Sequence, residues 1–303
     1  MRRKGMKDTI YSREQYLRKR AAEKEALNIQ LTNNYAFRKL FKMNYIARGF
    51  LIALLGLDEE DIVKLEVIDP FEEGENEKEK EGILDIKIYL NNKKKINIEI
   101  QNRYQEDWTE RSLFYNCRMF TEGFYHGQPY GDLEPCIHVG ILNFDLMKTS
   151  GFHHHIKLID IKTNEEYSSK FQFHVVQLKQ IESATEEEKQ TELYYWVKLL
   201  AVKDWQQVEE TIRGNPYREA VKQEMYKMSQ DEKERYLYLR EEMAVSDEVS
   251  RMRTARKEGI KEGEKRGIKL TKKVFQLSQK GCTIAQIAEK CNIEESEVKE
   301  ILE

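Results

Sequence analysis

The chain has 303 residues, which is long enough for one large domain and an appendage. No apolar run approaches the ~18 residues that a membrane-spanning helix needs, and the first residues, MRRKGMKDTI, lack the apolar centre of a signal peptide. Four cysteines without a C-x-x-C pair argue against a zinc site and a disulfide framework. We therefore expect a protein of the reducing cytoplasm that does not associate with a membrane.

The net charge of −3 conceals a segregation of charge along the chain. Residues 251–273 hold ten Lys and Arg against three Glu, a net charge of +7, which leaves −10 for the other residues. A basic block of this kind often contacts nucleic acid. A solvated, charged helix is the alternative, and the sequence favours neither.

The region before the first strand is predicted to be mostly helical. Residues 12–30 are highly charged and poor in Gly and Pro, so we expect a helical extension outside the core. Asn33 is a suitable N-cap for helices that cover the sheet, and Gly56 is a suitable end for them. Residues 66–82 turn acidic and poor in apolar residues after Pro70, which predicts an exposed loop without metal ligands.

Two segments alternate between apolar and polar residues, which is the period of a β-strand. In ILDIKIYL, residues 83–90, the apolar side chains share one face and Asp85 lies on the other. INIEIQ, residues 96–101, repeats the pattern with Glu99 and Gln101 on its polar face. The polar residues NNKKK between them predict the turn of an antiparallel hairpin. Residues paired across such a hairpin lie symmetrically about the turn, so Asp85 should face Glu99.

Two carboxylates at cross-strand distance repel each other unless a cation lies between them. Oxygen ligands favour a hard divalent ion such as Mg²⁺, with Mn²⁺ as a substitute. Asp85 and Glu99 therefore predict a metal site. A solvated sheet face with scattered charges gives the same alternation, and periodicity alone does not exclude it.

The hairpin is followed by an aromatic helix pattern over residues 106–125. Arg111, Tyr115 and Arg118 fall on one stripe of this helix.

Two further segments, PCIHVGILNFDL at 135–146 and FQFHVVQL at 171–178, predict buried strands. The run from His153 to His155 lies between them and invites a metal assignment. Adjacent residues of an extended chain cannot converge on one ion, and no carboxylate or cysteine stands at ligand spacing. We therefore expect a surface turn at these histidines.

The chain after the last of these strands is predicted to be helical. Gly259, Gly263 and Gly267 lie on one face of the basic helix, where they admit a close backbone or form a flexible linker. The final 23 residues, GCTIAQIAEKCNIEESEVKEILE, have helix-turn-helix spacing, but two Lys and six Glu in the last 20 argue against contact with phosphates. A helical cap or a homodimer contact is the better interpretation of this segment.

Four stretches together resemble one family. They are NNYAFRKLF at 33–41, GILDIKIYL at 82–90, INIEIQ with the ERSLFYN that follows it, and KEGIKEGEKRGIKL at 257–270. The run of Asp85 and then Glu99-Ile100-Gln101 is similar to the D…(E/D)-x-K signature of the PD-(D/E)XK nuclease superfamily, with glutamine in place of lysine.

In this order, the four stretches resemble the PD-(D/E)XK nuclease family transposases, or recombination-promoting nucleases, from about residue 31 onward. Asn34 departs from the family, in which aspartate is common at this position. We therefore expect no third acidic ligand from this helix.

The resemblance implies an α/β fold with a restriction-endonuclease-like core, a mixed sheet flanked by helices, and an all-α C-terminal region. On this basis we expect a helical extension at 1–30, the nuclease-like core at 31–180, a helical bundle at 181–250, and the basic helix with the helix-turn-helix-like segment at 251–303.

The resemblance also implies a Mg²⁺-dependent endonuclease that hydrolyses phosphodiester bonds of DNA in recombination or transposition. Asp85, Glu99 and the Ile100 carbonyl would hold the ion. Gln101 would orient the attacking water, and Arg111, or less directly Arg118, would contact a phosphate. A module of the same fold that binds DNA or a protein without cutting is the alternative.

Overall fold

The computed structural model describes residues 15–68, 86–91 and 93–303. The chain divides into two compact units, Met1–Glu241 and Glu242–Glu303, and each has its own hydrophobic core. Among the described residues, no helix is both long and apolar enough to cross a membrane.

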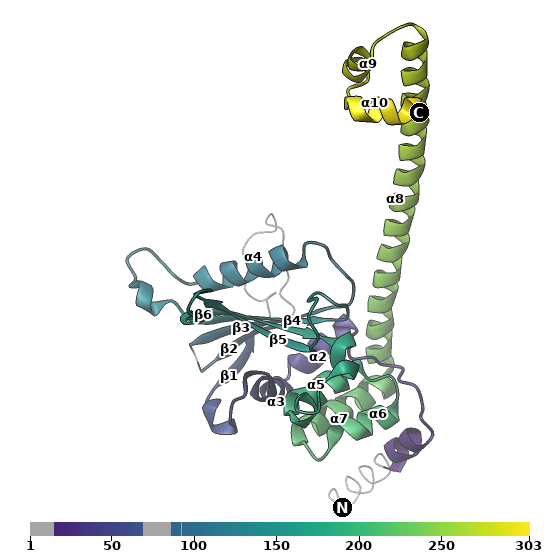
Figure 1. The fold of residues 1–303 in the computed structure, drawn as a ribbon. Helices are drawn as coiled ribbons and strands as arrows, with labels where there is room; N and C mark the ends of the chain where they lie inside the picture. Colours follow the sequence, from purple (N-terminus) through teal and green to yellow (C-terminus); the bar gives the residue numbers. More distant parts are fainter. Residues whose placement is uncertain (1–14, 69–85, 92) are drawn as a thin grey trace, which may run out of the picture. The chain divides into compact units, whose positions relative to one another are not determined.

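In the described part of the first unit, six strands form a mixed sheet (Figure 1). They are β1 (Leu65–Ile68), β2 (Ile86–Leu90), β3 (Lys94–Gln101), β4 (Cys136–Leu142), β5 (His153–Ile159) and β6 (Glu166–Gln177), in the spatial order β1-β2-β3-β4-β6-β5. The strands β3, β4 and β6 run parallel, and β1, β2 and β5 are antiparallel to their neighbours. This mixed sheet with flanking helices confirms the expected fold class.

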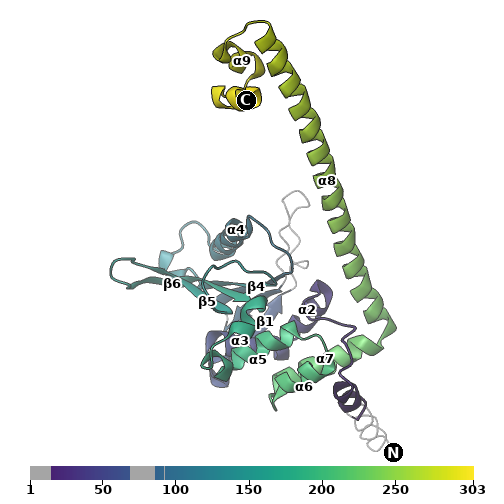
Figure 2. The same cartoon turned by 45° about the vertical axis from the view of Figure 1, so that its right-hand side comes forward.

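Helices cover both faces of the sheet (Figures 1 and 2). One face carries α4 (Trp108–Thr121), which connects the parallel strands β3 and β4. The other face carries α2 (Asn34–Phe41), α3 (Asn44–Leu55), α5 (Glu192–Ala201), α6 (Trp205–Ile212) and α7 (Pro216–Gln230). Short 3-10 helices lie at Glu59–Asp61, Tyr130–Asp132, Leu178–Ser183 and Glu188–Gln190, and α8 (Glu232–Gln279) begins in this unit.

The sheet face opposite α4 forms the main core. The isoleucines of the two predicted strands, Ile86, Ile88, Ile96, Ile98 and Ile100, are each at most 2% exposed there. The side chains of α3 and α5 pack onto them, with the rings of Phe50 and Trp196 5.8 Å apart. Burial of these side chains supplies the dominant driving force for this half of the fold.

The strands β2 and β3 form the predicted antiparallel hairpin. Their described pairs run from Ile86↔Ile98 to Leu90↔Lys94, so the register is symmetric about residue 92 as predicted. Asn91 in the turn has a φ of 54°, a left-handed conformation that Asn tolerates better than most residues. Asp85 lies outside the described residues, so its pairing with Glu99 stays a prediction.

The helices that follow the sheet have the caps that their sequence indicates. Thr191 caps α5, Asp204 caps α6, and Asn215 caps α7 with Pro216 in its first turn. Their apolar faces join the core beneath the sheet. The nuclease-like core and the bundle region, which we expected as separate segments, therefore lie within one compact unit.

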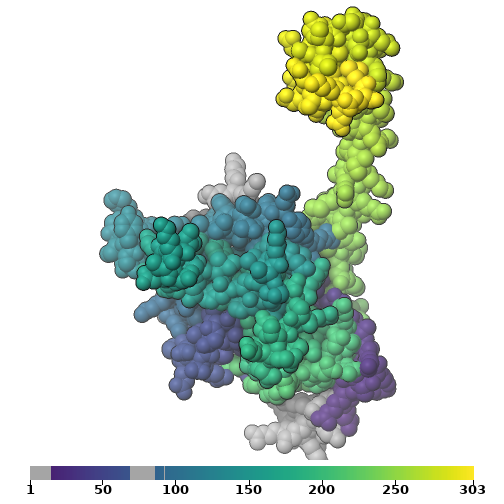
Figure 3. Space-filling model, viewed as in Figure 1, coloured from purple at the N-terminus to yellow at the C-terminus, as the bar shows by residue number. Residues whose placement is uncertain are grey.

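The expectation that residues 12–30 lie outside the core is wrong for the described part of this segment. Leu17 and Ile29 are each 1% exposed and belong to the main core. Ala26 forms an isolated bridge with Asp204, and the segment lies against the later helices (Figure 3). Its composition indicated a helix but could not indicate a partner that lies so far along the chain.

The expectation of a surface turn at His153–His155 is also wrong, because these residues begin β5. His153 and His155 stack on His174 of β6, with ring centroids 5.1 and 4.1 Å from it. Burial lowers the pKa of His174 to about 3, so these rings stack with an uncharged imidazole at ordinary pH. Within the described residues there is no group of three or more His, Cys, Asp or Glu that could hold a metal ion.

The second unit contains the remainder of α8 with α9 (Ile284–Cys291) and α10 (Glu295–Leu302). Val274, Ile287 and Val298 form the centre of its small core. Thr283 caps α9 in a capping box, and Asn292 ends this helix at a φ of 54°. The two short helices are those that the apolar spacing predicted.

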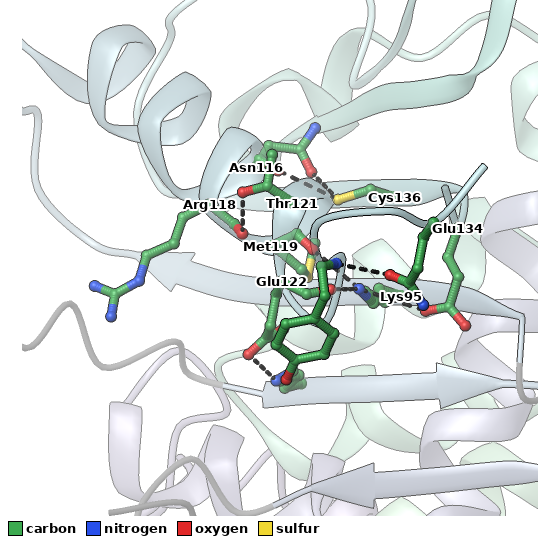
Figure 4. Close-up of polar contacts among 11 residues, drawn as sticks. Lys95, Asn116, Arg118, Met119, Thr121, Glu122, Glu134 and Cys136 are labelled. Atoms are coloured by element: carbon green, nitrogen blue, oxygen red, sulfur yellow. Dashed lines mark hydrogen bonds and ion pairs between the residues drawn. The ribbon is translucent and has the colours of Figure 1, made fainter. Parts of the chain in front are cut away.

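The C-terminal end of α4 is fixed to the sheet by a buried lysine (Figure 4). Lys95 of β3 is 3% exposed, and its Nζ donates to the backbone carbonyls of Glu122 and Met119 and lies 3.4 Å from Glu134 Oε2. The last carbonyls of a helix have no partner within the helix, so the ammonium group acts as a cap and complements the negative end of the helix dipole.

Replacement of Lys95 by Met keeps the apolar stem and removes the donor. We expect Lys95→Met to lower the free energy of unfolding by about 1–3 kcal/mol, because buried carbonyls lose their partner. Urea unfolding followed by tryptophan fluorescence measures the change. Lys93→Met, at an exposed turn residue, is the control, and equal unfolding of the two variants would contradict the capping role.

Candidate active site

A row of polar side chains lies between the sheet and α4. The alternation of β3 directs Asn97 and Glu99 to this face, and His138 and Gly140 of β4 are their cross-strand partners. Asn97, Glu99 and His138 are at most 4% exposed. The interpretation of this face as a solvated surface is therefore wrong, because α4 covers it.

The buried carboxylate of Glu99 is paired with a cation from α4. Arg111 Nη2 donates to Glu99 Oε1 at 3.0 Å. The guanidinium also lies 5.2 Å from the centroid of the Tyr115 ring, which restricts its position. A buried carboxylate without a counter-charge is costly, so the contact with Arg111 offsets part of the cost of burying Glu99 beneath the helix.

The other carboxylate oxygen of Glu99 faces a histidine. His138 Nε2 lies 4.0 Å from Glu99 Oε2, and its Nδ1 is 3.1 Å from the amide nitrogen of Asn97. Burial, with a smaller contribution from the positive charge of Arg111, lowers the pKa of His138 to about 3. His138 is therefore a neutral imidazole at ordinary pH.

An indole ring forms the wall of this site, and a glycine makes room for it. Gly140 pairs with Glu99 in the sheet, and a Cβ at this position would lie 2.2 Å from Cζ2 of Trp108. The Trp108 ring is 2% exposed, with its centroid 6.0 Å from that of His138. The first turn of α4 can therefore approach the sheet closely beside the carboxylate.

Several buried polar atoms around Glu99 lack a hydrogen-bond partner in the described part of the chain. Among the described residues, ten buried side-chain nitrogen or oxygen atoms lack a hydrogen bond. Four of them belong to Asn97, Trp108, Arg111 and His138, which contact Glu99 or one another. Buried polar groups of this kind are normally satisfied by water, an ion or a ligand. The chemistry of the site therefore fits a polar occupant.

The structure brings together some of the predicted site residues. Glu99 and Arg111 are in direct contact. Gln101 shares the face of Glu99, is half-buried, and donates from Nε2 to the carbonyl of Arg103 at 3.3 Å. Ile100 directs its side chain into the main core, as the alternation requires. Asp85 lies outside the described residues.

Arg118 and Asn34, two other residues that the sequence singled out, have surroundings different from those of the Glu99–Arg111 pair. Arg118 is exposed near the end of α4, and its side chain extends away from the buried cluster around Lys95 (Figure 4). Asn34 donates from Nδ2 to Glu241 Oε1 at 3.0 Å, so its amide binds the start of α8.

Sequence reasoning missed His138, Gly140 and Trp108. The strand CIHVGIL carries signals for two of them. Apart from its first residue, a cysteine, His138 is its one ionisable residue, and Gly140 interrupts a run of buried side chains. Glycine within a strand often marks the close approach of another group. Trp108 carried no such signal, since an aromatic residue at the start of a helix is most often an ordinary core residue.

The family described as PD-(D/E)XK nuclease family transposase matches residues 31–255. The chain belongs to this family. The mixed sheet with its flanking helices is consistent with a restriction-endonuclease-like fold. No curated protein and no solved structure matches the chain.

Membership of the nuclease transposase family gives the polar row between β3 and α4 its context. Glu99 lies near the carboxyl end of β3, and β3 is the first of the three parallel strands. Ligands of α/β proteins commonly bind near the carboxyl ends of parallel strands.

About half of α8 and both helices that follow it lie beyond the matched residues, so the family match does not describe most of the second unit.

The contact between Gly140 and Trp108 leads to a stability prediction. We expect Gly140→Ala to lower the free energy of unfolding by about 1–3 kcal/mol, because the added methyl group displaces the indole ring. Urea unfolding and the tryptophan emission spectrum report the change. Gly131→Ala, where a Cβ meets nothing within 4 Å, is the control. A Gly140→Ala protein as stable as this control would contradict the close approach of α4.

Proposed function

We propose that this protein is a metal-dependent DNA endonuclease that hydrolyses phosphodiester bonds in recombination or transposition. The observation that carries the proposal is the buried Glu99 carboxylate on β3, which is paired with Arg111 and surrounded by polar atoms that have no hydrogen-bond partner among the described residues. It occurs at the Glu of the signature Glu99-Ile100-Gln101 in a chain of the nuclease transposase family.

Glu99, Asp85 and the carbonyl of Ile100 would hold the divalent ion, with Mg²⁺ preferred and Mn²⁺ accepted. All three supply oxygen atoms, which are the ligands of hard cations. When bound, the ion would supply Lewis-acid stabilisation of the phosphate and a more acidic water. Because Asp85 neighbours β2 in sequence and Glu99 lies on β3, the proposed ligands come from a hairpin whose register the isoleucine core fixes.

Arg111 would have two successive partners. In this structure its guanidinium pairs with Glu99, and its side chain is 36% exposed. If Glu99 ligates a cation, the Arg111 guanidinium would turn to a phosphate oxygen, which arginine binds with favourable geometry. Arg118, exposed on the same helix, is a second phosphate ligand of less direct geometry.

Gln101 would hold the attacking water. An amide donates and accepts hydrogen bonds but does not take up a proton, so Gln101 is not a general base. Its Nε2 donates to a backbone carbonyl two residues away at 3.3 Å, a hydrogen bond that a small rotation of the side chain breaks. The amide could therefore orient a water on the face that Glu99 shares.

One observation favours the second candidate function, a module that binds DNA or a protein without cutting. The Arg111 pair already neutralises Glu99, as in a structural ion pair. Titration with metal separates the two functions, because a structural pair does not exchange its arginine for Mg²⁺.

The decisive experiment is the cleavage of supercoiled plasmid with and without Mg²⁺ or Mn²⁺. We expect the wild type to nick DNA only with metal. We expect Glu99→Gln to be slower by ~10²-fold or more, because the ion supplies several kcal/mol and each ~1.4 kcal/mol is a factor of ten. Glu110→Gln, an exposed glutamate of α4, is the control with the same chemical change.

Thermal melting adds a test that does not depend on turnover. Mg²⁺ should raise the melting temperature of the wild type by mass action but not that of Asp85→Asn. A wild type that neither gains stability with metal nor nicks DNA would establish the non-cleaving module instead.

The basic part of α8 is the proposed binding site for the DNA backbone. Lys257, Lys261, Lys265 and Lys269 recur at every fourth position and are all exposed. Such residues form one ridge along a helix. A Cβ at the intervening Gly259, Gly263 or Gly267 would meet nothing within 4 Å, so the surface beside the ridge is open.

Replacement of the four ridge lysines by glutamine tests this role of α8. We expect weaker DNA binding and a shallower dependence of log affinity on log salt, by ~0.9 for each phosphate that the variant no longer neutralises. Filter binding over a series of salt concentrations measures the slope. Replacement of the same lysines by arginine keeps the charge and should keep the slope, whereas an unchanged slope in the glutamine variant would make this helix a linker.

A further inference from the structure

His138 is a fully buried ionisable group beside the proposed metal ligand. It is 0% exposed, and its Nε2 has no hydrogen-bond partner within the described residues. This nitrogen faces the Oε2 atom of Glu99, at 4.0 Å. The distance is too long for a hydrogen bond and short enough to become one after a small movement of the carboxylate.

The position of the imidazole proton follows from the neighbours of the ring. A neutral imidazole carries one N–H group, and the amide nitrogen of Asn97 lies 3.1 Å from Nδ1. The amide donates to Nδ1, which places the proton on Nε2. The reverse arrangement would turn a lone pair of Nε2 toward the Glu99 carboxylate and is electrostatically unfavourable. His138 therefore presents a donor to Glu99.

The two oxygens of Glu99 face different groups. Oε1 accepts from Arg111, and Oε2 faces His138. If Arg111 releases Oε1 as proposed above, that oxygen would be available to a cation, and a hydrogen bond at Oε2 would oppose rotation of the carboxylate. Residues that hydrogen-bond to a ligating carboxylate fix its orientation and raise metal affinity.

We propose that His138 is a positioning residue for Glu99: its Nε2–H binds Oε2 and directs Oε1 toward the divalent ion. Asn97 fixes the tautomer that makes this donation feasible. The inference rests on the proposed function, and it adds two residues, one on β4 and one on β3, that the nuclease signature does not contain.

Two amide substitutions of different length isolate the donor. In His138→Gln the side-chain NH2 reaches the position of Nε2, whereas in His138→Asn it reaches only that of Nδ1. The readout is Mn²⁺ binding to the full-length protein, measured by the electron paramagnetic resonance signal of free Mn²⁺. We expect His138→Asn to weaken Mn²⁺ binding by ~10-fold and His138→Gln to stay within ~3-fold of the wild type.

His174→Asn is the matched control, because His174 is also buried but faces His153 and His155 on β5. It should leave Mn²⁺ affinity unchanged. Asn97→Leu gives a second route if His138→Asn does not fold. Without the amide, either ring nitrogen of His138 can carry the proton, so this variant should weaken Mn²⁺ binding several-fold.

The outcomes separate this inference from the proposed function. A wild type that binds no Mn²⁺, or binds it equally well as Glu99→Gln, overturns both. Wild-type binding that depends on Glu99 but is unchanged in folded His138→Asn, or in Asn97→Leu, overturns only the role of His138. Binding that is abolished equally in His138→Asn and His138→Gln also overturns the donor role, because it would indicate that the ring nitrogen ligates the ion.

Discussion

The burial of one carboxylate beneath α4 constrains the rest of the site. Glu99 is on a strand whose other face is fixed in the main core, so its side chain cannot turn away without exposing isoleucines. It must therefore be neutralised where it lies, and Arg111 does this from the helix above. The same helix excludes water from the face, which strengthens every electrostatic interaction within it. The packing of α4 on the sheet thus sets the position of Glu99, the charge beside it and the local dielectric constant.

That arrangement depends on two sets of interactions at opposite ends of α4. Near its start, Trp108 packs onto the bare backbone of Gly140. Beyond its end, Lys95 binds the last carbonyls and Lys87 Nζ lies 2.8 Å from Glu122 Oε1. A helix held at both ends keeps Arg111 at a fixed height above the sheet. The two buried lysines are therefore structural, although each lies on the polar face of the hairpin.

The sequence predicted those features that depend on local periodicity. The hairpin, its register and the buried isoleucines follow from a period of two, and a shift of one residue would have exposed the whole apolar face. It could not predict that the polar face is also buried, because the covering helix packs Trp108 onto a glycine 32 positions later. The edge strand β5 was missed because HHHIKLI does not alternate cleanly and its outer half is exposed. The sequence identified Glu99 and Arg111 separately as charged residues of the candidate site. Their ion pair depends on how α4 packs on the sheet, which the sequence does not show.

The positive charge beside Glu99 comes from the helix and not from the strand. Arg111 of α4 contacts Glu99, whereas Gln101, two residues after Glu99 on β3, carries an uncharged amide. If Asp85 and Glu99 hold a divalent ion as proposed, the ion and the two carboxylates balance one another, and the charge of Arg111 is left for a phosphate. On that proposal, the arginine on the helix would take over the electrostatic task that a lysine on the strand performs in the usual signature.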